Sequence, residues 1–449
     1  MLFNDPRSYI HALPRFALAA EDIITLTDTA AFRETLLAHI AKAQHRIYLT
    51  ALYLQHDEGG AMVLEALYAA RKRNPALEIA VLVDWHRAQR GLIGKGKADG
   101  NAAWYQDEAA KHPDQEVAVY GVPVQTRELF GVLHLKGFIV DDTVIYSGAS
   151  LNNVYLHVGE RYRYDRYHLI TNRGLADSMV ALLKDTVLAS PAVHRLDQPN
   201  PPATKSIRGD IRALRERLSN SHYQSQVQDQ AAPGSLGVTP LLGVGKRNPL
   251  NRLIQKLMAS TRSHLVICTP YFNLPRPLMR EIRQLLARGV RVDIIVGDKT
   301  ANDFFIPPSE PFKVIGALPY LYEANLRRFA QAQQADIDAG RLNLLLWNDP
   351  GHSYHLKGLW VDQEFMLITG NNLNPRAFSL DLENGLLLHD PQQQLAAQKE
   401  QELAAIRANT SRINHYLDLE TVDHYPEPVR KLLTRMNRVR ADRLVSRLL

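Results

Sequence analysis

The chain has 449 residues, 45% of them hydrophobic, and is long enough for two or three domains with substantial cores. Its single cysteine, Cys268, excludes an intrachain disulfide framework or a zinc site built from cysteines. The formal net charge of +6 comes from 53 basic and 47 acidic residues. Residues 429–449 hold seven of the basic residues and one of the acids, so 46 of each remain elsewhere. A neutral body argues against a general nucleic-acid binder, which needs a basic groove.

The N-terminal part of the chain alternates between helical and strand patterns. Apolar residues at helical spacing predict helices at 31–43 and 60–73, and short apolar runs predict strands at 45–53 and 78–84. A helix between two apolar strands predicts a βαβ unit, and therefore a largely parallel sheet. We expect a Gly- and Lys-rich loop at 87–101 and further strands at 134–141, 144–146 and 167–170.

A polar segment, residues 198–237, separates two similar halves. It is rich in Pro, Gln and Ser, apart from a charged helical stretch at 207–218, and this composition predicts a linker. The elements expected after it repeat the earlier order: helix 249–260, strand 264–269, helix 278–288 and strand 290–296. His45 and His264 are 219 positions apart, and His134 and His355 are 221 apart, so the repeat has nearly constant spacing.

This repetition predicts an internal duplication. We expect an α/β protein of two pseudo-symmetric halves with mixed, largely parallel sheets and the active site between them. The predicted parts are a first half at 1–197, a linker at 198–237, a second half at 238–428 and a basic amphipathic helix at 429–449.

Two segments, 134–141 and 355–362, share the pattern His-x-Lys, then an apolar run and an aspartate. Alternate side chains of an extended segment share a face, so each copy places one imidazole beside one ammonium group. Each copy leads into a polar turn, at 148–152 or 370–374. The candidate catalytic residues are His134, Lys136, Asp141, His355, Lys357 and Asp362, and the candidate phosphate-binding residues are Ser150, Asn152, Asn372 and Asn374.

Two facing copies of this pattern are suited to phosphodiester exchange without a metal or cofactor. One neutral imidazole attacks phosphorus, the other moves a proton, and the ammonium groups stabilise negative charge on the phosphoryl oxygens. A carboxylate is expected to orient each histidine. Glu383 is one candidate; Asp165 is its nearest counterpart in the first half, and Glu160 is the alternative.

A single His-x-Lys match is weak evidence, but two copies inside a duplication are not expected by chance. The aspartates differ from the histidines. Asp141 and Asp362 lie five residues past their lysines, at the far end of a strand, so a structural ion pair or turn is favoured over chemistry there.

With these motifs and their downstream Gly and Asn, both halves resemble the phospholipase D superfamily. The segments 354–362, 369–378 and 380–384 are similar to the bacterial phosphatidylserine synthases of that superfamily, as are 146–152 and 162–168. The resemblance implies a duplicated phospholipase D-like fold and the reaction of CDP-diacylglycerol with L-serine to give phosphatidylserine and CMP, through a phosphatidyl-histidine. It also implies His134 as nucleophile and His355 as acid and then base.

The C-terminal residues suggest where this chemistry takes place. From Val429 on, apolar residues recur at helical spacing among basic ones, which predicts a helix that binds an anionic membrane surface. The alternatives are packing on the protein's own core or binding to ribosomes. A second candidate for lipid contact is the aromatic segment 303–322. Because no run approaches the length of a membrane span, we expect a cytoplasmic protein attached peripherally to the inner face of the membrane.

Three functions remain open at this point. The first is the synthase. The second is another enzyme with the same histidine pair, namely a phospholipase D, a cardiolipin synthase or a nuclease, although the neutral body argues against specific binding of nucleic acid. The third is a protein that docks on ribosomes or membranes with a vestigial site, against which both intact His-Lys pairs argue.

Overall fold

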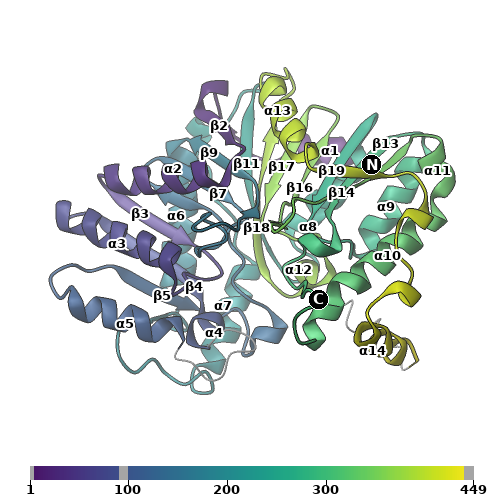
Figure 1. Ribbon diagram of the computed structural model, residues 1–449. Helices are drawn as coiled ribbons and strands as arrows, with labels where there is room; N and C mark the ends of the chain where they lie inside the picture. The colour runs from purple at the N-terminus through teal and green to yellow at the C-terminus, as the bar shows by residue number, and fades with distance from the viewer. Residues whose placement is uncertain (1–4, 91–99, 439–449) are drawn as a thin grey trace.

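The computed structural model describes residues 5–90 and 100–438, and its two halves lie side by side (Figure 1). The first half and linker contain α1 (Pro6–His11), β1 (Phe16–Ala17), β2 (Ile23–Leu26), α2 (Thr29–Lys42), β3 (Arg46–Thr50), α3 (Glu58–Arg73), β4 (Glu78–Asp84), α4 (Trp85–Gln89), α5 (Asn101–Lys111), β5 (Ala118–Val122), β6 (Phe138–Val140), β7 (Thr143–Ser147), β8 (Arg163–Tyr164), β9 (Tyr167–Thr171), α6 (Arg173–Ala181), β10 (His194–Arg195) and α7 (Arg208–Ser219).

The second half repeats this order with additional helices. It contains β11 (Gly237–Val244), α8 (Pro249–Ser260), β12 (His264–Thr269), α9 (Arg276–Ala287), β13 (Arg291–Gly297), α10 (Leu318–Ala332), α11 (Gln334–Asp338), β14 (Leu342–Trp347), β15 (Ser353–Tyr354), β16 (Gly358–Val361), β17 (Phe365–Thr369), α12 (Pro375–Ser379), β18 (Leu382–His389), α13 (Ala396–Arg407), β19 (Thr410–Ile413) and α14 (Glu427–Arg438).

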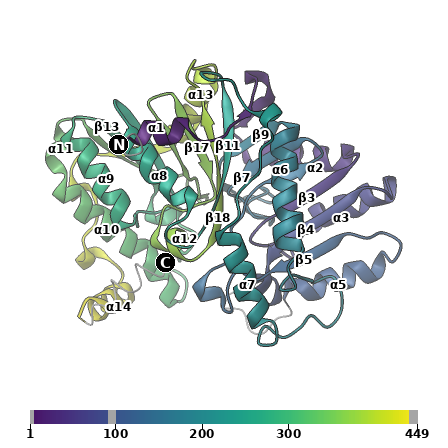
Figure 2. The same ribbon diagram turned by 180° about the vertical axis from the view of Figure 1, so that it is seen from behind.

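The two large sheets have the same topology. One has the order β10-β5-β4-β3-β6-β7-β9-β2, and the other has β19-β14-β13-β12-β16-β17-β18-β11 with β1 added at its edge. The sheets thus correspond strand by strand, which confirms the duplicated α/β fold. Figure 2 shows α6 on the side of the first sheet opposite to α2 and α3.

The expectation of largely parallel sheets is wrong. In the part of the first sheet that the structure describes, only β3–β4 and β4–β5 are parallel, and their counterparts are β12–β13 and β13–β14. The remaining neighbours are antiparallel. For β6 and β7 the reason is the connection length: they are joined by residues 141–142, and so short a turn permits only an antiparallel pair.

Helix and strand positions agree closely with the sequence patterns, because local signals define their ends. Asn248 caps α8 by accepting a hydrogen bond from Asn251 N–H, and Pro249 occupies the first helical position. Asp57 similarly caps α3, which begins two residues before its predicted start. The Gly- and Lys-rich loop expected at 87–101 lies partly outside the described residues, since 91–99 are not described.

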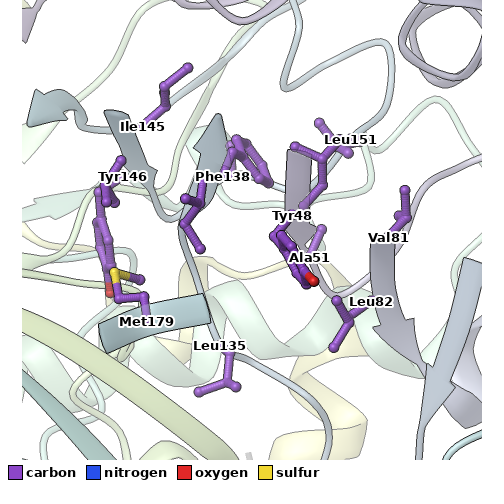
Figure 3. Close-up of a cluster of buried hydrophobic side chains, with 14 of the residues drawn as sticks. Tyr48, Ala51, Val81, Leu82, Leu135, Phe138, Ile145, Tyr146, Leu151 and Met179 are labelled. Atoms are coloured by element: carbon purple, nitrogen blue, oxygen red, sulfur yellow. The ribbon is translucent and has the colours of Figure 1, made fainter. Parts of the chain in front are cut away.

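The His-x-Lys residues differ from the prediction, because they precede β6 and β16 rather than belonging to them. Gly137 and Gly358 follow the lysines with φ of 118° and 152°, and the regular strands begin only at Phe138 and at Gly358 itself. Leu135 and Leu356, between each His and Lys, are only 2% and 1% exposed. Figure 3 shows Leu135 within the buried cluster that contains Tyr48 and Phe138. These leucines anchor the two motifs in the core.

The proposed domain boundaries stay a prediction, but two contacts cross them. Residues 16–17 pair with β11, so the first strand of the chain joins the second sheet. In the linker, α7 buries Ile211, Leu214 and Leu218. The N-terminus and the linker therefore pack against the folded halves.

The described part of the basic C-terminal segment is α14. Val429 and Leu433 are buried in a cluster with Tyr320 and Leu321 of α10. The first part of the apolar stripe thus packs on the protein itself, which was the alternative to membrane binding, while Val439 and the rest of the stripe lie outside the described residues. Across the described ranges, no helix has the length and apolar character needed to span a membrane.

Candidate active site

The two histidines are held by carboxylates from the opposite halves. His134 Nδ1 lies 2.9 Å from both oxygens of Glu383, and His355 Nδ1 lies 2.9 Å from Asp165 Oδ2. A ring that donates its Nδ1–H to a carboxylate leaves the Nε2 lone pair for chemistry. Each half therefore completes the other's histidine, and Glu160, which is exposed, does not take part.

Backbone pairing explains this exchange. His134 N–H donates to Leu382 O at 2.9 Å, next to Glu383. His355 N–H donates to Tyr164 O at 2.8 Å, next to Asp165. Each motif histidine thus bonds the backbone of the residue directly before the other half's acid, in the same arrangement on both sides of the site.

The two lysines are buried beside the histidines. Lys136 and Lys357 are 2% and 1% exposed, and Lys357 Nζ lies 3.1 Å from Asp165 Oδ2. The glycines of the polar turns make room for them: a Cβ on Gly370 would lie 2.6 Å from Lys136 Cγ, and one on Gly148 would lie 2.6 Å from Lys357 Nζ. Here too, each half accommodates the lysine of the other.

Burial and like charges set the protonation of the site. Burial, together with Lys357, lowers the pKa of Lys136 to about 7 and that of His355 to about 4. Burial, together with Lys136, also holds the pKa of His134 well below its usual range. Burial would raise the pKa of Asp165, but Lys357 and His355 outweigh it and lower this pKa to about 2. The site thus combines neutral imidazoles with ammonium groups that attract a phosphoryl anion.

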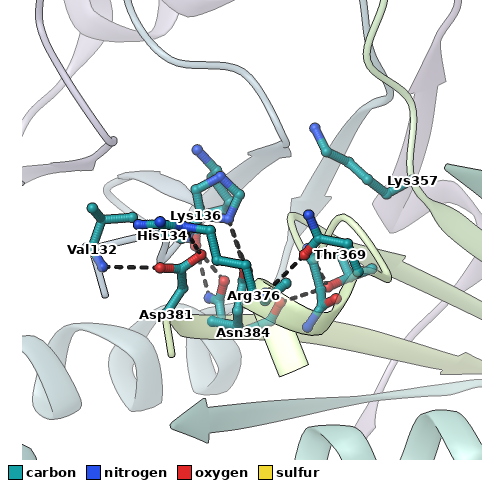
Figure 4. Close-up of polar contacts among 12 residues, drawn as sticks. Val132, His134, Lys136, Lys357, Thr369, Arg376, Asp381 and Asn384 are labelled. Carbon is teal, nitrogen blue, oxygen red and sulfur yellow. Dashed lines mark hydrogen bonds and ion pairs between the residues drawn. The ribbon is translucent and has the colours of Figure 1, made fainter. Parts of the chain in front are cut away.

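An amide from β18 fixes the first motif. Asn384 Oδ1 accepts a hydrogen bond from Lys136 N–H at 2.9 Å, and Asn384 Nδ2 donates to Lys136 O at 2.8 Å. Tyr146 and Thr369 donate to the backbone carbonyl of Asn384 at 3.1 and 2.8 Å. Figure 4 shows Asn384 among the residues beneath His134 and Lys136. Asn384 acts as a clamp on the backbone of the lysine.

The motif aspartates lie apart from the histidines. Asp141 accepts hydrogen bonds from the backbone N–H groups of residues 44–46, and Asp362 from those of residues 262–264. Both have a left-handed φ, 51° and 52°. The structure therefore places these aspartates in turns that tie two strands together, and does not bring them to the reacting groups.

The polar turns contribute unequally to a cavity of about 600 Å³ beside His134. Asn372 and Asn374 line it, and Asn372 Oδ1 is buried without a hydrogen-bond partner in the described part of the chain. Asn374 Oδ1 caps α12. In the other turn, Ser150 is buried and Asn152 Oδ1 accepts from Tyr155 N–H at 3.1 Å. The other lining residues are Leu52, Arg87, Arg90, Glu128, Leu129, Val132, Tyr271, Phe304, Ile315, Tyr322, Arg376 and Asp381.

One group of described residues has the atoms for a metal site, away from the histidine pair. Potential ligand atoms of His11, Glu364 and His389 lie within 4.8 Å of one another. Arg7 already bonds Glu364, and Arg15 contacts His389 Nδ1. Two guanidinium groups therefore oppose a further cation there.

Known proteins share this architecture. A family model described as "Cardiolipin synthase, PLD-like domain" matches residues 36–180 and 253–407. The chain belongs to the phospholipase D superfamily. CDP-diacylglycerol–serine O-phosphatidyltransferases of Escherichia coli and Haemophilus influenzae are each 52% identical to it, covering 99% and 98% of this chain and 98% and 97% of their own lengths. The crystal structure of the H. influenzae phosphatidylserine synthase superposes with a TM-score of 0.96 at 51% identity, over 99% of each chain.

Within this phospholipase D framework, sequence patterns missed two contacts. Tyr155 OH lies 3.0 Å from His355 Nδ1, and Asn384 clamps the first motif as described above. The duplication gives no signal for Tyr155, because the aligned position in the second half is Ala377. For Asn384 the only sequence signal is its position directly after Glu383, a predicted site residue.

Proposed function

We propose that the chain is a CDP-diacylglycerol–serine O-phosphatidyltransferase, which converts CDP-diacylglycerol and L-serine to phosphatidylserine and CMP. Its 52% identity to two such enzymes, over nearly the whole of each chain, carries the proposal. The paired histidines and buried lysines supply the required chemistry. A nuclease is disfavoured because the body of the chain is formally neutral.

In the first step, His134 Nε2 attacks the phosphatidyl phosphorus, a P–N bond forms and the P–O bond to CMP breaks. The apolar cavity beside His134 supports this assignment, since it can take the glyceride part of the lipid. The leaving phosphate has a second pKa of about 6 and needs little help from an acid. The bound anion favours the protonated form of His355, and in that form His355 gives its proton to the departing CMP.

In the second step, His355 takes the proton of the serine hydroxyl, the serine oxygen attacks phosphorus and the P–N bond to His134 breaks. Because burial and Lys357 lower the pKa of His355, its ring is neutral in the neutral range and has a lone pair that can accept this proton. Lys136 and Lys357 stabilise the phosphoryl oxygens in both steps.

The test is to incubate purified protein with CDP-diacylglycerol, with and without L-serine, and to follow CMP and lipid products. Serine-dependent phosphatidylserine is the expected result. DNA cleavage without CMP release would overturn the proposal.

A matched pair of variants tests the order of the steps. His134→Ala removes the nucleophile, so labelled phosphatidyl-enzyme should not accumulate from labelled CDP-diacylglycerol. His355→Ala keeps the nucleophile and should still form labelled enzyme, while its transfer to serine is slow. Gels run after a detergent quench at alkaline pH, where the P–N bond survives, detect the labelled enzyme. Labelling of His134→Ala at the wild-type level would assign the nucleophile elsewhere.

We also propose that the enzyme works at the surface of an anionic membrane. The charged side chains of Arg430, Lys431 and Arg435 are exposed on α14. Near the cavity, Leu129 and Phe130 are 51% and 42% exposed. From the aromatic segment 303–322, Phe312 and Val314 are 39% and 70% exposed, while Phe304 and Ile315 line the cavity itself. An apolar rim of this kind suits entry of acyl chains from a bilayer.

A further inference from the structure

The surroundings of the two histidines are not symmetric, although their carboxylate partners are. Asp165 and Glu383 correspond in the duplication, and two residues before them stand Arg163 and Asp381. His355 also has the Tyr155 hydroxyl within 3.0 Å. The side of the site that contains His355 thus carries Arg163 and Tyr155, where the corresponding positions of the second half hold Asp381 and Ala377.

Arg163 forms a charged pair with a residue of the other half. Its Nε lies 2.8 Å from Asp303 Oδ1 and 3.2 Å from Ser353 Oγ. Its guanidinium carbon lies 4.7 Å from the ring centroid of Tyr155, the tyrosine that contacts His355. Arg163, Asp303 and Tyr155 therefore form one group next to the general base, which we call the acceptor cluster.

The acceptor cluster is partly open to solvent, although its two charges are paired with each other. Asp303 Oδ1 is buried and lies 2.8 Å from Arg163 Nε. The side chains of His355, Arg163 and Asp303 are 10%, 15% and 23% exposed, so solvent exposure increases from the histidine to Asp303.

A similar ion pair beside His134, between Arg376 and Asp381, already makes several hydrogen bonds within the protein. Asp381 accepts a hydrogen bond from Val132 N–H at 3.0 Å and pairs with Arg376 at 3.2 Å. Arg376 donates further hydrogen bonds to the carbonyls of Glu128 and Leu129. This second pair joins segments of the two halves and leaves less capacity for a ligand.

The geometry of displacement at phosphorus determines which substrate lies next to the acceptor cluster. In an in-line displacement, the incoming and leaving oxygens occupy the side of phosphorus opposite the histidine nucleophile. With His134 as nucleophile, the acceptor hydroxyl must arrive on the side of His355. A positive and a negative group held together match a zwitterion, whereas a diphosphate requires a net positive surface.

We propose that Arg163 binds the carboxylate and Asp303 the ammonium group of L-serine, with the serine hydroxyl directed at His355 beside Tyr155. This assignment rests on the proposed function and adds the basis of its acceptor specificity. Of three arginines near the first motif, it selects Arg163: Arg161 is exposed, and Arg166 is buried in a pair with Glu402 at 2.7 Å.

The test compares three acceptors in the wild-type enzyme: L-serine, L-serine amide, which lacks the carboxylate, and N-acetyl-L-serine, which lacks the ammonium group. CMP release without acceptor reports the first step separately. We expect kcat/KM to favour serine over each analogue by about tenfold or more, as for the loss of a charge-assisted hydrogen bond. Equal use of the three acceptors would overturn the assignment without reference to any variant.

Two variants then connect each charge to its partner. In Arg163→Gln the preference for serine over serine amide should fall about tenfold, while the preference over N-acetylserine persists. Asp303→Asn should give the converse pattern. Arg161→Gln is the matched control and should retain both preferences. A purely structural role would slow all three acceptors in parallel and would refute the assignment, whereas a wild-type enzyme that never releases CMP would refute the proposed function instead.

Discussion

At the scale of single residues, the most informative group is Lys136, whose pKa burial and Lys357 lower to about 7. The ammonium form exists below that pH and the neutral amine above it. The attraction for the phosphoryl oxygens is therefore present at lower pH and is lost as pH rises through about 7. We expect kcat/KM for CDP-diacylglycerol, which reports the free enzyme, to fall above this pH.

Lys136→Arg provides the control for this profile, because a guanidinium stays charged to a pH of about 12. Its plateau activity is expected to be lower, since arginine does not fit the space beside Gly370. The alkaline fall should nevertheless move to higher pH. A pH profile that is identical in the two proteins would show that another group titrates.

The sequence predicted which residues form the site better than it predicted which of them contact one another. The repeated motif predicted His134 and His355, and the structure places Glu383 and Asp165, two of the three acids considered, beside them. Which acid contacts which histidine depends on how the halves face each other, and no local pattern contains that information. Tyr155 and Arg163 were harder still, because single residues outside the repeat have no periodicity or spacing that distinguishes them.

At the scale of elements, the glycines of the polar turns leave the space that the lysine side chains occupy. Gly370→Ala would place a methyl group 2.6 Å from Lys136 Cγ and force the lysine stem to move. Because a displacement of about 1 Å can cost about 100-fold in rate, we expect a loss of that order in phosphatidyl transfer, with about 1–3 kcal/mol of destabilisation. Steady-state kinetics and urea unfolding measure the two effects.

The matched control is Gly209→Ala in α7, where an added Cβ has no neighbour within 4 Å. This change should leave activity as it is and raise stability by about 0.5–1 kcal/mol, because alanine is the better helix former. If Gly370→Ala retained full activity, the turn would not be required to admit the lysine.

The helix α14 presents two faces with different partners. Since Val429 and Leu433 pack on α10, deletion of the segment would also uncover the core. Replacing the exposed Arg430, Lys431 and Arg435 by glutamine separates the two roles. Each basic residue near an anionic surface contributes about 1 kcal/mol before screening, so the triple variant should bind anionic vesicles at least about tenfold more weakly.

Sedimentation with vesicles at two salt concentrations measures this binding. Activity on neutral detergent micelles should change little, because the catalytic groups lie elsewhere. Equal losses on vesicles and micelles would count against α14 as a membrane contact.

At the scale of the whole molecule, the duplication explains why the active site needs both halves. One hydrophobic cluster includes Tyr48 and Phe138 of the first half together with Trp347 and Leu382 of the second. The linker also contributes, since Tyr223 OH accepts a hydrogen bond from Asn384 Nδ2 at 3.2 Å. Sequence periodicity predicted the two halves and their order. It could not show that β1 crosses to the second sheet, because a strand of two residues has no pattern of its own.

Separating the halves should therefore abolish activity, and reuniting them should restore it. With the chain divided after Gln224, the fragment 1–224 contains His134 without Glu383, and the fragment 225–449 contains His355 without Asp165. Each fragment alone should release no CMP from CDP-diacylglycerol, whereas the two produced together should recover serine-dependent synthesis, because pairing of β1 with β11 and the shared core favour reassembly. Co-production with His134→Ala in the first fragment is the control and should stay inactive. Turnover by either fragment alone would mean that one half contains a complete site, contrary to the exchange of carboxylates between the halves.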